Sequence, residues 1–417
     1  MAQLSDDCFA FGGALLGVDA ALALIAERIA PVVEPEDVPL AQAAGRVLAR
    51  DLVAAIDVPP HANSAVDGFA FHHADLAADG ETVLPVGGRA AAGHPLGRPA
   101  RRGEAIRIFT GASMPDGADT VMMQEDCLVE GGSVRLRPGI RKGANRRHAG
   151  EDVAAGSVAL VAGRRLKPAD LGLAAALGST ELPVFRPLRA ALLSTGDEVG
   201  DPGASLPPGA IYDANRHMLA ALLRAQGCVV SDLGICADRA AALAGTLAEA
   251  AAGHDVIVTS GGVSTGEEDH VRTAIETLGR LDFWRLAIKP GRPVALGQVK
   301  GVPLIGLPGN PVAAALTFAI LARPLLARLG GAAITQPLTF PVAAGFAYRK
   351  KPGRREYLRA SLAREDGRAI ARRYAKDGAG ILSSIVQSDG FAILDESMAD
   401  IAPGTTIEFL PFSEVFG

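Results

Sequence analysis

Apolar residues near the start of the chain recur at helical spacing. The run consists of Leu15, Leu16, Val18, Leu22, Ile25 and Ile29, and Pro31 with Glu34-Pro35 ends it. Apolar positions three and four residues apart share one face of a helix, and proline does not continue a helix. The pattern predicts a helix with one buried face.

From Ile56 to about Gly150 the chain changes to short apolar runs separated by turn residues, such as Pro59-Pro60, Gly87-Gly88 and Pro115-Asp116-Gly117. Regular Gly and Pro punctuation is typical of short strands joined by turns. We therefore expect a small β-rich inserted domain over 56–152. Residues 153–186 return to a strand and helix pattern, and we expect them to join the N-terminal segment in one discontinuous domain.

Strand-like and helix-like segments alternate between residues 188 and 330. The strands are expected at 188–193, 229–233, 256–259 and 302–306, and the helices at 215–226, 239–252 and 271–278. Such alternation is typical of an α/β domain with a mostly parallel sheet. Beyond about residue 335 strand-like runs return, which predicts a small C-terminal β domain.

The chain is therefore predicted to be an α/β multi-domain protein. Its expected parts are an N-terminal discontinuous domain (1–55 plus 153–186), a β-rich inserted domain (56–152), a central α/β domain (187–332) and a C-terminal β domain (333–417). The 417 residues agree with this division, because a typical domain has roughly 150 residues.

Composition narrows the classes of function. The formal net charge is −5, which gives no electrostatic footprint for nucleic-acid binding. Residues 1–20 lack the basic start of a secretory signal. The longest apolar helical run, Val312–Ala322, lies between Pro311 and Arg323-Pro324, which makes it too short to span a bilayer. Cys8, Cys127, Cys228 and Cys236 have neither disulfide-framework nor metal-site spacing. We expect a cytoplasmic protein without a membrane or nucleic-acid partner.

Three loops of the central domain follow predicted strands and are rich in glycine and hydroxyl residues. They are Ser194-Thr195-Gly196-Asp197-Glu198, Ser260-Gly261-Gly262-Val263-Ser264-Thr265-Gly266 and Leu307-Pro308-Gly309-Asn310-Pro311. In an α/β sheet, ligands bind beyond the carboxyl ends of the strands, where backbone N–H groups face anions. One such loop alone is usually only a turn. Three at corresponding positions predict a phosphorylated ligand.

Carboxylates are concentrated in the same region: Asp197, Glu198, Asp213, Asp238, Glu267, Glu268 and Asp269. Carboxylates beside phosphate-binding loops commonly hold Mg²⁺, although those before residue 271 could instead cap a helix. Lys289 lies between an apolar run and a Pro-Gly turn, where it could face an anion or simply be solvated. Candidate segments of the inserted domain, 63–68, 110–112 and 145–152, could all be turns by sequence alone.

Taken together, these loops resemble those of the molybdenum-insertion enzymes of molybdenum-cofactor synthesis, bacterial MoeA and the E domain of gephyrin. The resemblance runs over nearly the whole chain. It is carried by Pro59-Pro60-His61-Ala62-Asn63-Ser64-Ala65-Val66-Asp67-Gly68-Phe69-Ala70, Thr110-Gly111-Ala112, Gly150-Glu151-Asp152, the three loops above, Ile211-Tyr212-Asp213-Ala214-Asn215-Arg216 and Lys289-Pro290-Gly291-Arg292-Pro293.

The resemblance implies an elongated four-domain subunit that forms a homodimer, with each active site between the α/β domain of one subunit and the inserted domain of the other. The implied reaction inserts molybdenum from molybdate into adenylylated molybdopterin and releases AMP, with Mg²⁺ as the cofactor. The implied partners are these small molecules, the adenylyltransferase that makes the substrate and the downstream molybdoenzymes.

The resemblance also implies site residues. The catalytic set is Asp67, Thr110, Asp152, Glu198, Asp238, Asp269, Arg285 and Lys289, and the metal ligands are drawn from Glu198, Asp238 and Asp269. The residues that bind the pterin phosphates and the oxyanion are Ser194, Thr195, Gly196, Asp197, Ser260, Gly261, Gly262, Ser264, Arg292, Pro308, Gly309, Asn310 and Arg359.

The sequence departs from the family pattern at several positions. Arg285 stands where many relatives have lysine, so a planar guanidinium replaces a point charge. The family's C-terminal arginine falls best on Arg359, with Arg354 as a competitor. The family's serine near Gly378 corresponds to Ala379, so its contact is either absent or made by Ser383 or Ser384.

Two other functions compete with molybdenum insertion. The preceding adenylylation step could use the same α/β domain, but it would need neither the inserted nor the C-terminal domain. A non-catalytic pterin-binding scaffold, as gephyrin also is, would be expected to carry linkers and extra domains, and none is evident in the sequence.

Overall fold

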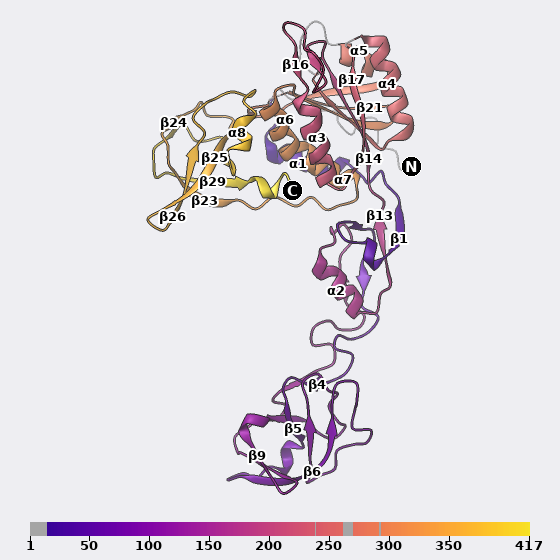
Figure 1. Ribbon diagram of the computed structural model, residues 1–417, viewed down its shortest axis with the longest axis vertical. Coiled ribbons are helices and arrows are strands. Elements are labelled where there is room, and N and C mark those ends of the chain that lie inside the picture. The colour runs from indigo at the N-terminus through magenta and orange to yellow at the C-terminus, as the bar shows by residue number, and fades with distance from the viewer. Residues whose placement is uncertain (1–14, 238, 262–269, 292) are drawn as a thin grey trace.

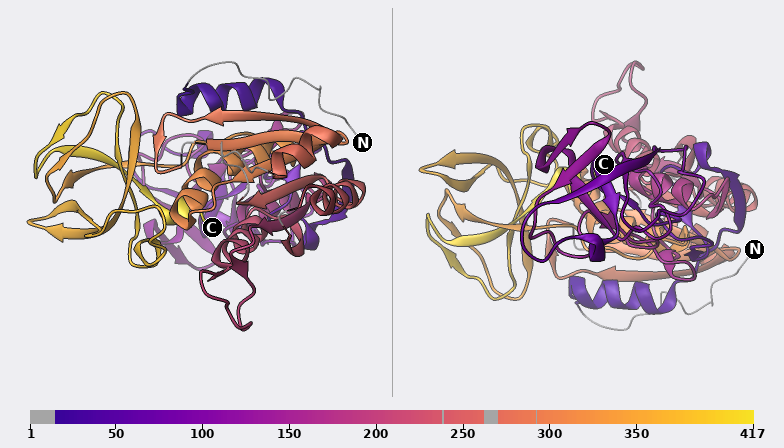
Figure 2. Two further views of the ribbon diagram at one scale, coloured as in Figure 1. Left: turned by 90° about the horizontal axis from the view of Figure 1, so that it is seen from above. Right: turned by 90° about the horizontal axis from the view of Figure 1, so that it is seen from below.

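The computed structural model describes residues 15–237, 239–261, 270–291 and 293–417. The chain is elongated (Figure 1). The central sheet and its helices lie at one end and the inserted β domain at the other, with a small unit around β1, β13 and α2 between them. The C-terminal strands lie to one side of the central domain, as both views in Figure 2 show.

The small middle unit is built from two distant stretches of sequence. Its three-stranded sheet has the order β1-β13-β2, and β3 pairs with β12. The elements are β1 (Pro35–Pro39), β2 (Val47–Leu48), β3 (Leu52–Val53), β12 (Val158–Leu160), α2 (Pro168–Ala176) and β13 (Glu181–Phe185). Pro168 begins α2, where its missing N–H costs no helical hydrogen bond. These pairings bring residues 35–53 against residues 158–185.

The inserted domain is a six-stranded sheet with the order β8-β5-β7-β6-β10-β9, and β4 pairs separately with β11. The strands are β4 (Asn63–Ser64), β5 (Gly68–Phe71), β6 (Thr82–Ala90), β7 (Ala105–Ile108), β8 (Thr120–Met123), β9 (Cys127–Glu130), β10 (Ser133–Leu136) and β11 (Arg146–Arg147). Alternate residues of β5 enter two separate cores, Phe69 and Phe71 one and Ala70 the other. The domain therefore has apolar cores on both faces of its sheet.

The central sheet has the order β17-β14-β18-β22-β21-β19. Its strands are β14 (Arg189–Thr195), β17 (Val229–Cys236), β18 (Val256–Ser260), β19 (Gly279–Arg285), β21 (Pro293–Val299) and β22 (Val302–Leu307). Its helices include α3 (Ala214–Ala225), α4 (Ala240–Gly253) and α5 (His270–Leu278). Along β14, Ala190 and Leu192 face one core while Ala191 and Leu193 face the other, so the sheet is buried on both faces.

The central sheet is mixed, and two of its strands were not anticipated from the sequence. Strands β17, β14, β18 and β22 are parallel, whereas β21 is antiparallel to both β22 and β19. Lys300 and Gly301, both with positive φ, form the two-residue hairpin turn between β21 and β22. Residues 294–299 are all buried and so lack the polar alternation that marks a strand.

The apolar helix of the central domain is longer than the sequence suggested. Pro324 does not end it: α6 (Pro311–Thr317) continues through a π-helical turn, Phe318–Ala322, into α7 (Arg323–Leu329). The wider turn accommodates the ring and the missing N–H of the proline. Pro311–Leu329 is the one helix in the described part of the chain that is long and apolar enough to cross a membrane, and 83% of its apolar window is buried inside the protein. It packs as a core helix.

The first helix, α1 (Val18–Arg28), lies apart from the middle unit with which the sequence grouped it. Its residues Val18, Ala21 and Ile25 belong to the same core as Leu192 and Leu326 of the central domain. Helical periodicity identified the buried face of α1, but it carries no information about which domain that face meets.

The C-terminal strands close into a barrel. They have the order β25-β26-β23-β29-β27, and β27 pairs back onto β25. The elements are β23 (Phe340–Ala344), β24 (Tyr348–Arg349), β25 (Arg355–Glu365), β26 (Arg368–Arg373), α8 (Ser383–Val386), β27 (Gly390–Leu394), β28 (Asp400–Ile401) and β29 (Thr406–Pro411). A short strand of the central domain, β20 (Ile288–Lys289), adds to β25 in parallel.

A buried carboxylate fixes the entry into the central sheet. Asp255, just before β18, accepts two hydrogen bonds from the Arg186 guanidinium at 2.6 and 2.9 Å and one from the backbone N–H of Arg189 at 2.8 Å. Burial alone would raise the pKa of Asp255, but the two arginines outweigh it and hold that pKa well below its usual range.

We predict that Asp255→Asn lowers the thermal unfolding midpoint at pH 7, because breaking a buried ion pair costs about 3 kcal/mol. For a domain of roughly 150–250 residues, that loss of stability lowers the unfolding midpoint by roughly 6–12 °C. The ionised carboxylate stabilises the fold at neutral pH and loses this contribution as the pH falls below about 4 toward the lowered folded-state pKa. The midpoint difference from wild type should therefore shrink at low pH. Asp37→Asn, which removes an exposed pair with Arg50, is the control. Equal shifts for the two variants would contradict the prediction.

Candidate active site

A solvent-open cavity of about 330 Å³ lies at the carboxyl ends of the parallel strands of the central sheet. Ser194 of β14 is in register with Ser260 of β18, and Ser260 is in register with Leu307 of β22. The loops that leave these strands therefore start side by side. The cavity is lined by Ser194, Thr195, Glu198, Val199, Ile211, Tyr212, Asp213, Ala214, Asn215, Ser260, Gly261, Gly309, Asn310 and Pro311.

The N-terminus of α3 forms one wall of this cavity. Asp213 caps the helix by accepting a hydrogen bond from the backbone N–H of Arg216 at 3.0 Å. The buried side chain of Asn215 then reaches across the cavity floor, and its Nδ2 donates to Ser260 Oγ at 2.9 Å and to the Gly309 carbonyl at 2.7 Å. One amide group thus connects α3 to two of the three strand-end loops.

Three buried polar atoms of the cavity wall have no hydrogen-bond partner within the described part of the chain. They are Ser194 Oγ, Thr195 Oγ1 and Asn215 Oδ1. A buried polar group left unpaired costs about 1–3 kcal/mol, and native proteins rarely contain such groups without a reason. Two hydroxyl donors and one amide acceptor that line an open cavity form an arrangement that can bind a polar ligand.

Glycine is required at two positions of the cavity wall. Gly261 has φ +85°, and a Cβ there would lie 2.7 Å from the Thr195 carbonyl oxygen. Gly196 has φ +131°, and a Cβ there would lie 2.6 Å from a Glu198 carboxylate oxygen. Both conformations disfavour other residues, and the absence of side chains leaves the backbone open to a ligand.

The carboxylates of the region are in different situations. Glu198 is exposed on the cavity wall, whereas Asp213 is buried and paired with Arg216 Nε at 3.0 Å. Arg216 also pairs with Asp201 and, at 2.7 Å, with Asp232. Burial opposes ionisation of Asp232, but the hydrogen bonds from Arg216 lower its pKa. Of the acidic residues on the cavity wall, Glu198 is therefore the one placed to meet a ligand or a cation.

Several predicted site residues lie outside the described residues: Asp238, Asp269, Gly262, Ser264 and Arg292. Within the described ranges, no group of three or more His, Cys, Asp or Glu side chains is close enough together to hold a metal ion. The predicted metal set of Glu198, Asp238 and Asp269 accordingly stays a prediction. Ser194, Thr195, Ser260, Gly261, Gly309 and Asn310 do meet in the cavity.

Asp67 and Thr110 of the inserted domain are brought together. The backbone N–H and the hydroxyl of Thr110 donate to Asp67 Oδ1 at 2.8 and 2.9 Å, and these hydrogen bonds lower the pKa of Asp67. The pair lies at the ends of β5 and β7, at the far end of the chain from α3 and α6 (Figure 1). Asp152 is exposed where the chain returns from the inserted domain. Within one chain, Asp67 and Thr110 therefore do not lie near the strand-end cavity.

Two of the predicted cations, Arg285 and Lys289, lie on the described strands β19 and β20. Arg285, at the end of β19, is exposed. Lys289 donates from Nζ to Glu356 Oε2 at 3.1 Å and to Tyr348 Oη at 3.2 Å. Burial alone would lower the pKa of Lys289, but its contacts with Tyr348 and Glu356 outweigh burial and raise it. Lys289 therefore carries a firmly held positive charge.

Arg359 is buried in the barrel and is not among the described residues that line the cavity. It donates to Ser384 Oγ at 3.0 Å and to the carbonyls of Gly378 and Lys376 at 3.2 and 3.3 Å, and burial lowers its pKa. The loop that it holds contacts the start of α6, because the Ala379 carbonyl accepts the Val312 N–H at 2.8 Å. Arg359 thus has a loop-supporting geometry in this structure.

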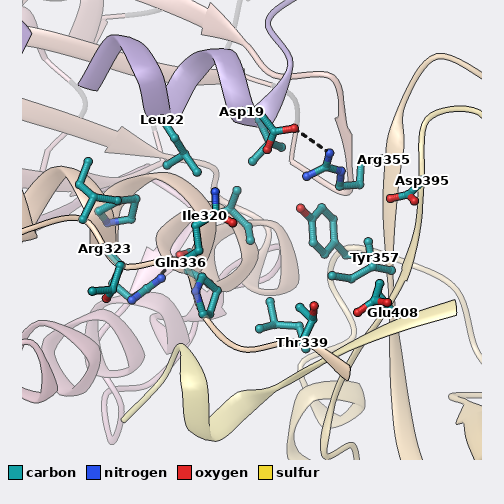
Figure 3. Close-up of a pocket in the computed structure, with 18 residues that line it drawn as sticks. Asp19, Leu22, Ile320, Arg323, Gln336, Thr339, Arg355, Tyr357, Asp395 and Glu408 are labelled. Carbon is teal, nitrogen blue, oxygen red and sulfur yellow. Dashed lines mark hydrogen bonds and ion pairs between the residues drawn. The ribbon is translucent and has the colours of Figure 1, made fainter. Parts of the chain in front are cut away.

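A second cavity, of about 220 Å³, lies between α1, the core helix and the barrel (Figure 3). Asp19 and Arg355 form an ion pair at 3.1 Å beside the ring of Tyr357, and burial raises the pKa of Tyr357 to about 12. The walls include the apolar side chains of Leu22 and Ile320. None of the predicted site residues lines this cavity, so the strand-end cavity is the candidate active site.

Sequence reasoning did not select five residues of the strand-end cavity: Val199, Ile211, Tyr212, Ala214 and Asn215. The last four belong to the Ile211–Arg216 segment that carried part of the family resemblance. That segment was available as a signal, but the chemistry of Asn215 depends on contacts 45 and 94 residues away in the chain.

Comparison with known proteins identifies this combination of domains. Residues 16–178 match the MoeA N-terminal region (domains I and II), residues 191–328 a probable molybdopterin-binding domain, and residues 341–412 the MoeA C-terminal region (domain IV). Along the chain, the three matched regions follow the same order as the structural units.

Full-length relatives agree with these matches. The molybdopterin molybdenumtransferase of Haemophilus influenzae is 36% identical over 406 residues, which cover 97% of this chain and 100% of that protein. Molybdopterin molybdenumtransferase 2 of Mycobacterium tuberculosis is 35% identical over 395 residues, covering 90% and 94% of the two chains. The crystal structure of a molybdopterin biosynthesis MoeA protein from Pyrococcus horikoshii superposes with a TM-score of 0.80 at 29% identity, covering 95% of this chain and 100% of that one. The chain belongs to the molybdopterin molybdenumtransferase family.

Proposed function

We propose that this protein inserts molybdenum from molybdate into adenylylated molybdopterin and releases AMP. Molybdenum transfer to molybdopterin is the activity for which the family is named. That the molybdopterin substrate is adenylylated is our own proposal, and one observation supports it. Ser194 Oγ, Thr195 Oγ1 and Asn215 Oδ1 are buried, have no hydrogen-bond partner among the described residues, and belong to residues that line one cavity. A substrate with phosphate oxygens and polar ring groups would pair with all three.

The cavity would bind the phosphates through its own donors. The two hydroxyls would donate to phosphate oxygens, and the N-terminus of α3 adds a positive electrostatic potential there. Asn215 Nδ2 is already used on Ser260 and Gly309, so its free oxygen would accept from a ligand N–H or O–H group. Gly261 would let the backbone approach the phosphates closely. These contacts would hold the reacting groups in a fixed orientation, which is itself a large source of rate enhancement.

Glu198 supports the proposal of a bound Mg²⁺ ion. This ion is usually held by one or two carboxylates together with substrate phosphates, and Glu198 supplies an exposed carboxylate on the cavity wall. We propose Glu198, with Asp238 and Asp269, as its ligands. When bound, the ion would polarise the phosphate that carries AMP and stabilise the charge on the leaving oxygen.

The inserted domain would act on the cavity of a second subunit. Asp67 and Thr110 are already hydrogen-bonded to each other, but Asp67 directly precedes β5, which Figure 1 shows at the other end of the same chain from α3. We therefore propose a homodimer in which the inserted domain of one subunit brings Asp67, Thr110 and Asp152 to the cavity of the other. Lys289, Arg285 and Arg292 would neutralise the oxyanion. A cytoplasmic location and contact with the substrate-making adenylyltransferase and with downstream molybdoenzymes complete the proposal.

The reaction is tested with purified protein, adenylylated molybdopterin, Mg²⁺ and molybdate, by following AMP. We expect AMP release that depends on molybdate. Consumption of ATP with free molybdopterin would instead show the adenylylation step. Tight binding of the pterin without AMP release would indicate a binding scaffold, and either result would contradict the proposal.

Removal of the Asn215 amide should disable the cavity. We predict that Asn215→Ala lowers kcat/KM for the pterin substrate by about 100-fold, because it breaks two hydrogen bonds within the site and one to the ligand. His217→Ala, an exposed position on the same helix, is the control and should leave kcat/KM within about twofold of wild type. Similar losses in both variants would refute a specific role for Asn215.

The role of Glu198 is checked by titrating Mg²⁺. Glu198→Gln keeps the size of the side chain but removes its charge, and we predict that the half-saturating Mg²⁺ concentration rises about tenfold. Glu249→Gln, an exposed carboxylate on α4, should not change it. An unaltered Mg²⁺ dependence in Glu198→Gln would exclude Glu198 as a ligand.

A further inference from the structure

The central domain and the C-terminal barrel share a strand pairing that ends on a lysine. Ile288 and Lys289 of β20 pair in parallel with Arg355 and Glu356 of β25, and the Arg355 N–H donates to the Ala287 carbonyl at 2.9 Å. Neighbouring residues of a strand point to opposite faces. Arg355 accordingly pairs with Asp19 of α1, whereas Glu356 faces Lys289.

Two hydrogen bonds connect Lys289 to two barrel residues, and a third joins those two residues to each other. Its Nζ donates to Glu356 Oε2 at 3.1 Å and to Tyr348 Oη at 3.2 Å. The Tyr348 hydroxyl in turn donates to the same Glu356 oxygen at 2.8 Å. The three groups form a closed triangle around one carboxylate oxygen, so the ammonium is fixed in direction as well as in distance.

Exposure is divided unequally within the triangle. The side chain of Glu356 is 2% exposed, while that of Lys289 is 51% exposed. A dissolved ligand cannot reach the buried Glu356 carboxylate, whereas the Lys289 ammonium is open to solvent on one side. The Lys289 ammonium is therefore held by Glu356 and Tyr348 on its buried side and exposed on the other side.

The other charges around the triangle are engaged elsewhere. The Arg373 guanidinium of β26 stacks on the Tyr348 ring at 5.0 Å and pairs with Asp377 at 3.3 Å. Lys350 donates to the carbonyls of Asp395 and Met398 at 2.6 and 3.0 Å. Glu356 is thus the carboxylate that serves Lys289, and the two cations nearby have partners of their own.

We propose that Glu356 and Tyr348 are positioning residues that hold the Lys289 ammonium in place for the anionic substrate. The inference rests on the proposed function, in which Lys289 neutralises the oxyanion. It adds that the C-terminal barrel contributes to the reaction through Lys289 without touching the substrate. The Glu356 carboxylate favours the charged form of Lys289, and the Tyr348 hydroxyl fixes the direction in which the ammonium points.

A purely structural role would make the triangle a clamp between two domains. The same junction, however, already has the β20–β25 pairing and the Arg355–Asp19 ion pair. A clamp predicts a loss of thermal stability with no preference for one substrate. A positioning role predicts that the effects of Glu356 and Tyr348 disappear once Lys289 is removed.

The test is a double-mutant cycle on molybdate-dependent AMP release. We expect Glu356→Gln and Tyr348→Phe each to lower kcat/KM for molybdate, the first by about tenfold and the second by about threefold. In a Lys289→Met background, either change should alter the residual rate by less than about twofold. Glu365→Gln, an exposed carboxylate on the same strand β25, is the matched control and should behave as wild type.

A second readout does not depend on turnover. Reductive ¹³C-methylation of lysines allows Lys289 to be titrated by NMR, and its resonance is assigned by its absence in Lys289→Arg. Because Glu356 favours the charged ammonium, Glu356→Gln should lower the pKa of Lys289. Glu365→Gln should leave that pKa unchanged.

The outcomes separate this inference from the proposed function. Additive losses in the cycle, or an unmoved Lys289 titration in Glu356→Gln, would overturn the positioning role even if the enzyme is active. Full activity of Lys289→Met would refute the proposed role of Lys289 itself, and the positioning role with it. If Glu356→Gln does not fold, Tyr348→Phe, which removes only a hydroxyl, carries the same cycle.

Discussion

The candidate site depends on one buried amide. Asn215 joins the N-terminus of α3 to the loops that follow β18 and β22, and these two hydrogen bonds add to the β18–β22 pairing that already sets the two loops side by side. Its oxygen and the hydroxyls of Ser194 and Thr195, three residues of the cavity wall, are buried and have no hydrogen-bond partner among the described residues. The residue that organises the cavity therefore also offers an acceptor to a polar ligand.

The long shape of the chain follows from where its cores form. The central sheet is covered on both faces, and the inserted sheet has its own two cores, so each unit buries its apolar residues within itself. The small middle unit separates them (Figure 1). Residues that the family resemblance assigns to one reaction thus lie at opposite ends of one molecule. A second subunit would bring them together, and the rigid pairing of Asp67 with Thr110 would then already be in place.

The sequence predicted those features that depend on local pattern. The amphipathic spacing of α1 and the alternation that gave α3, α4 and α5 are periodic signals, and parallel strands must end at the same edge, so the meeting of the Ser194, Ser260 and Gly309 loops was foreseeable. Features without a local signal were missed. Residues 294–299 are buried throughout and show no strand alternation. The core helix continues past Pro324 through a π-helical turn, and no local sequence signal predicts such a turn. The contact between Lys289 and Glu356 spans 67 residues and two domains, and no spacing rule predicts it.

The most direct test of the account is whether two defective subunits repair each other. Asn215→Ala should disable the cavity and Asp67→Ala the inserted domain, and each homodimer should be inactive. If each site combines parts of two subunits, mixed dimers carry one intact site, and a random mixture should recover about a quarter of wild-type activity. Recovery of molybdate-dependent AMP release near that level would support the shared site. A mixture as inactive as its components, with mixed dimers shown to be present, would contradict it.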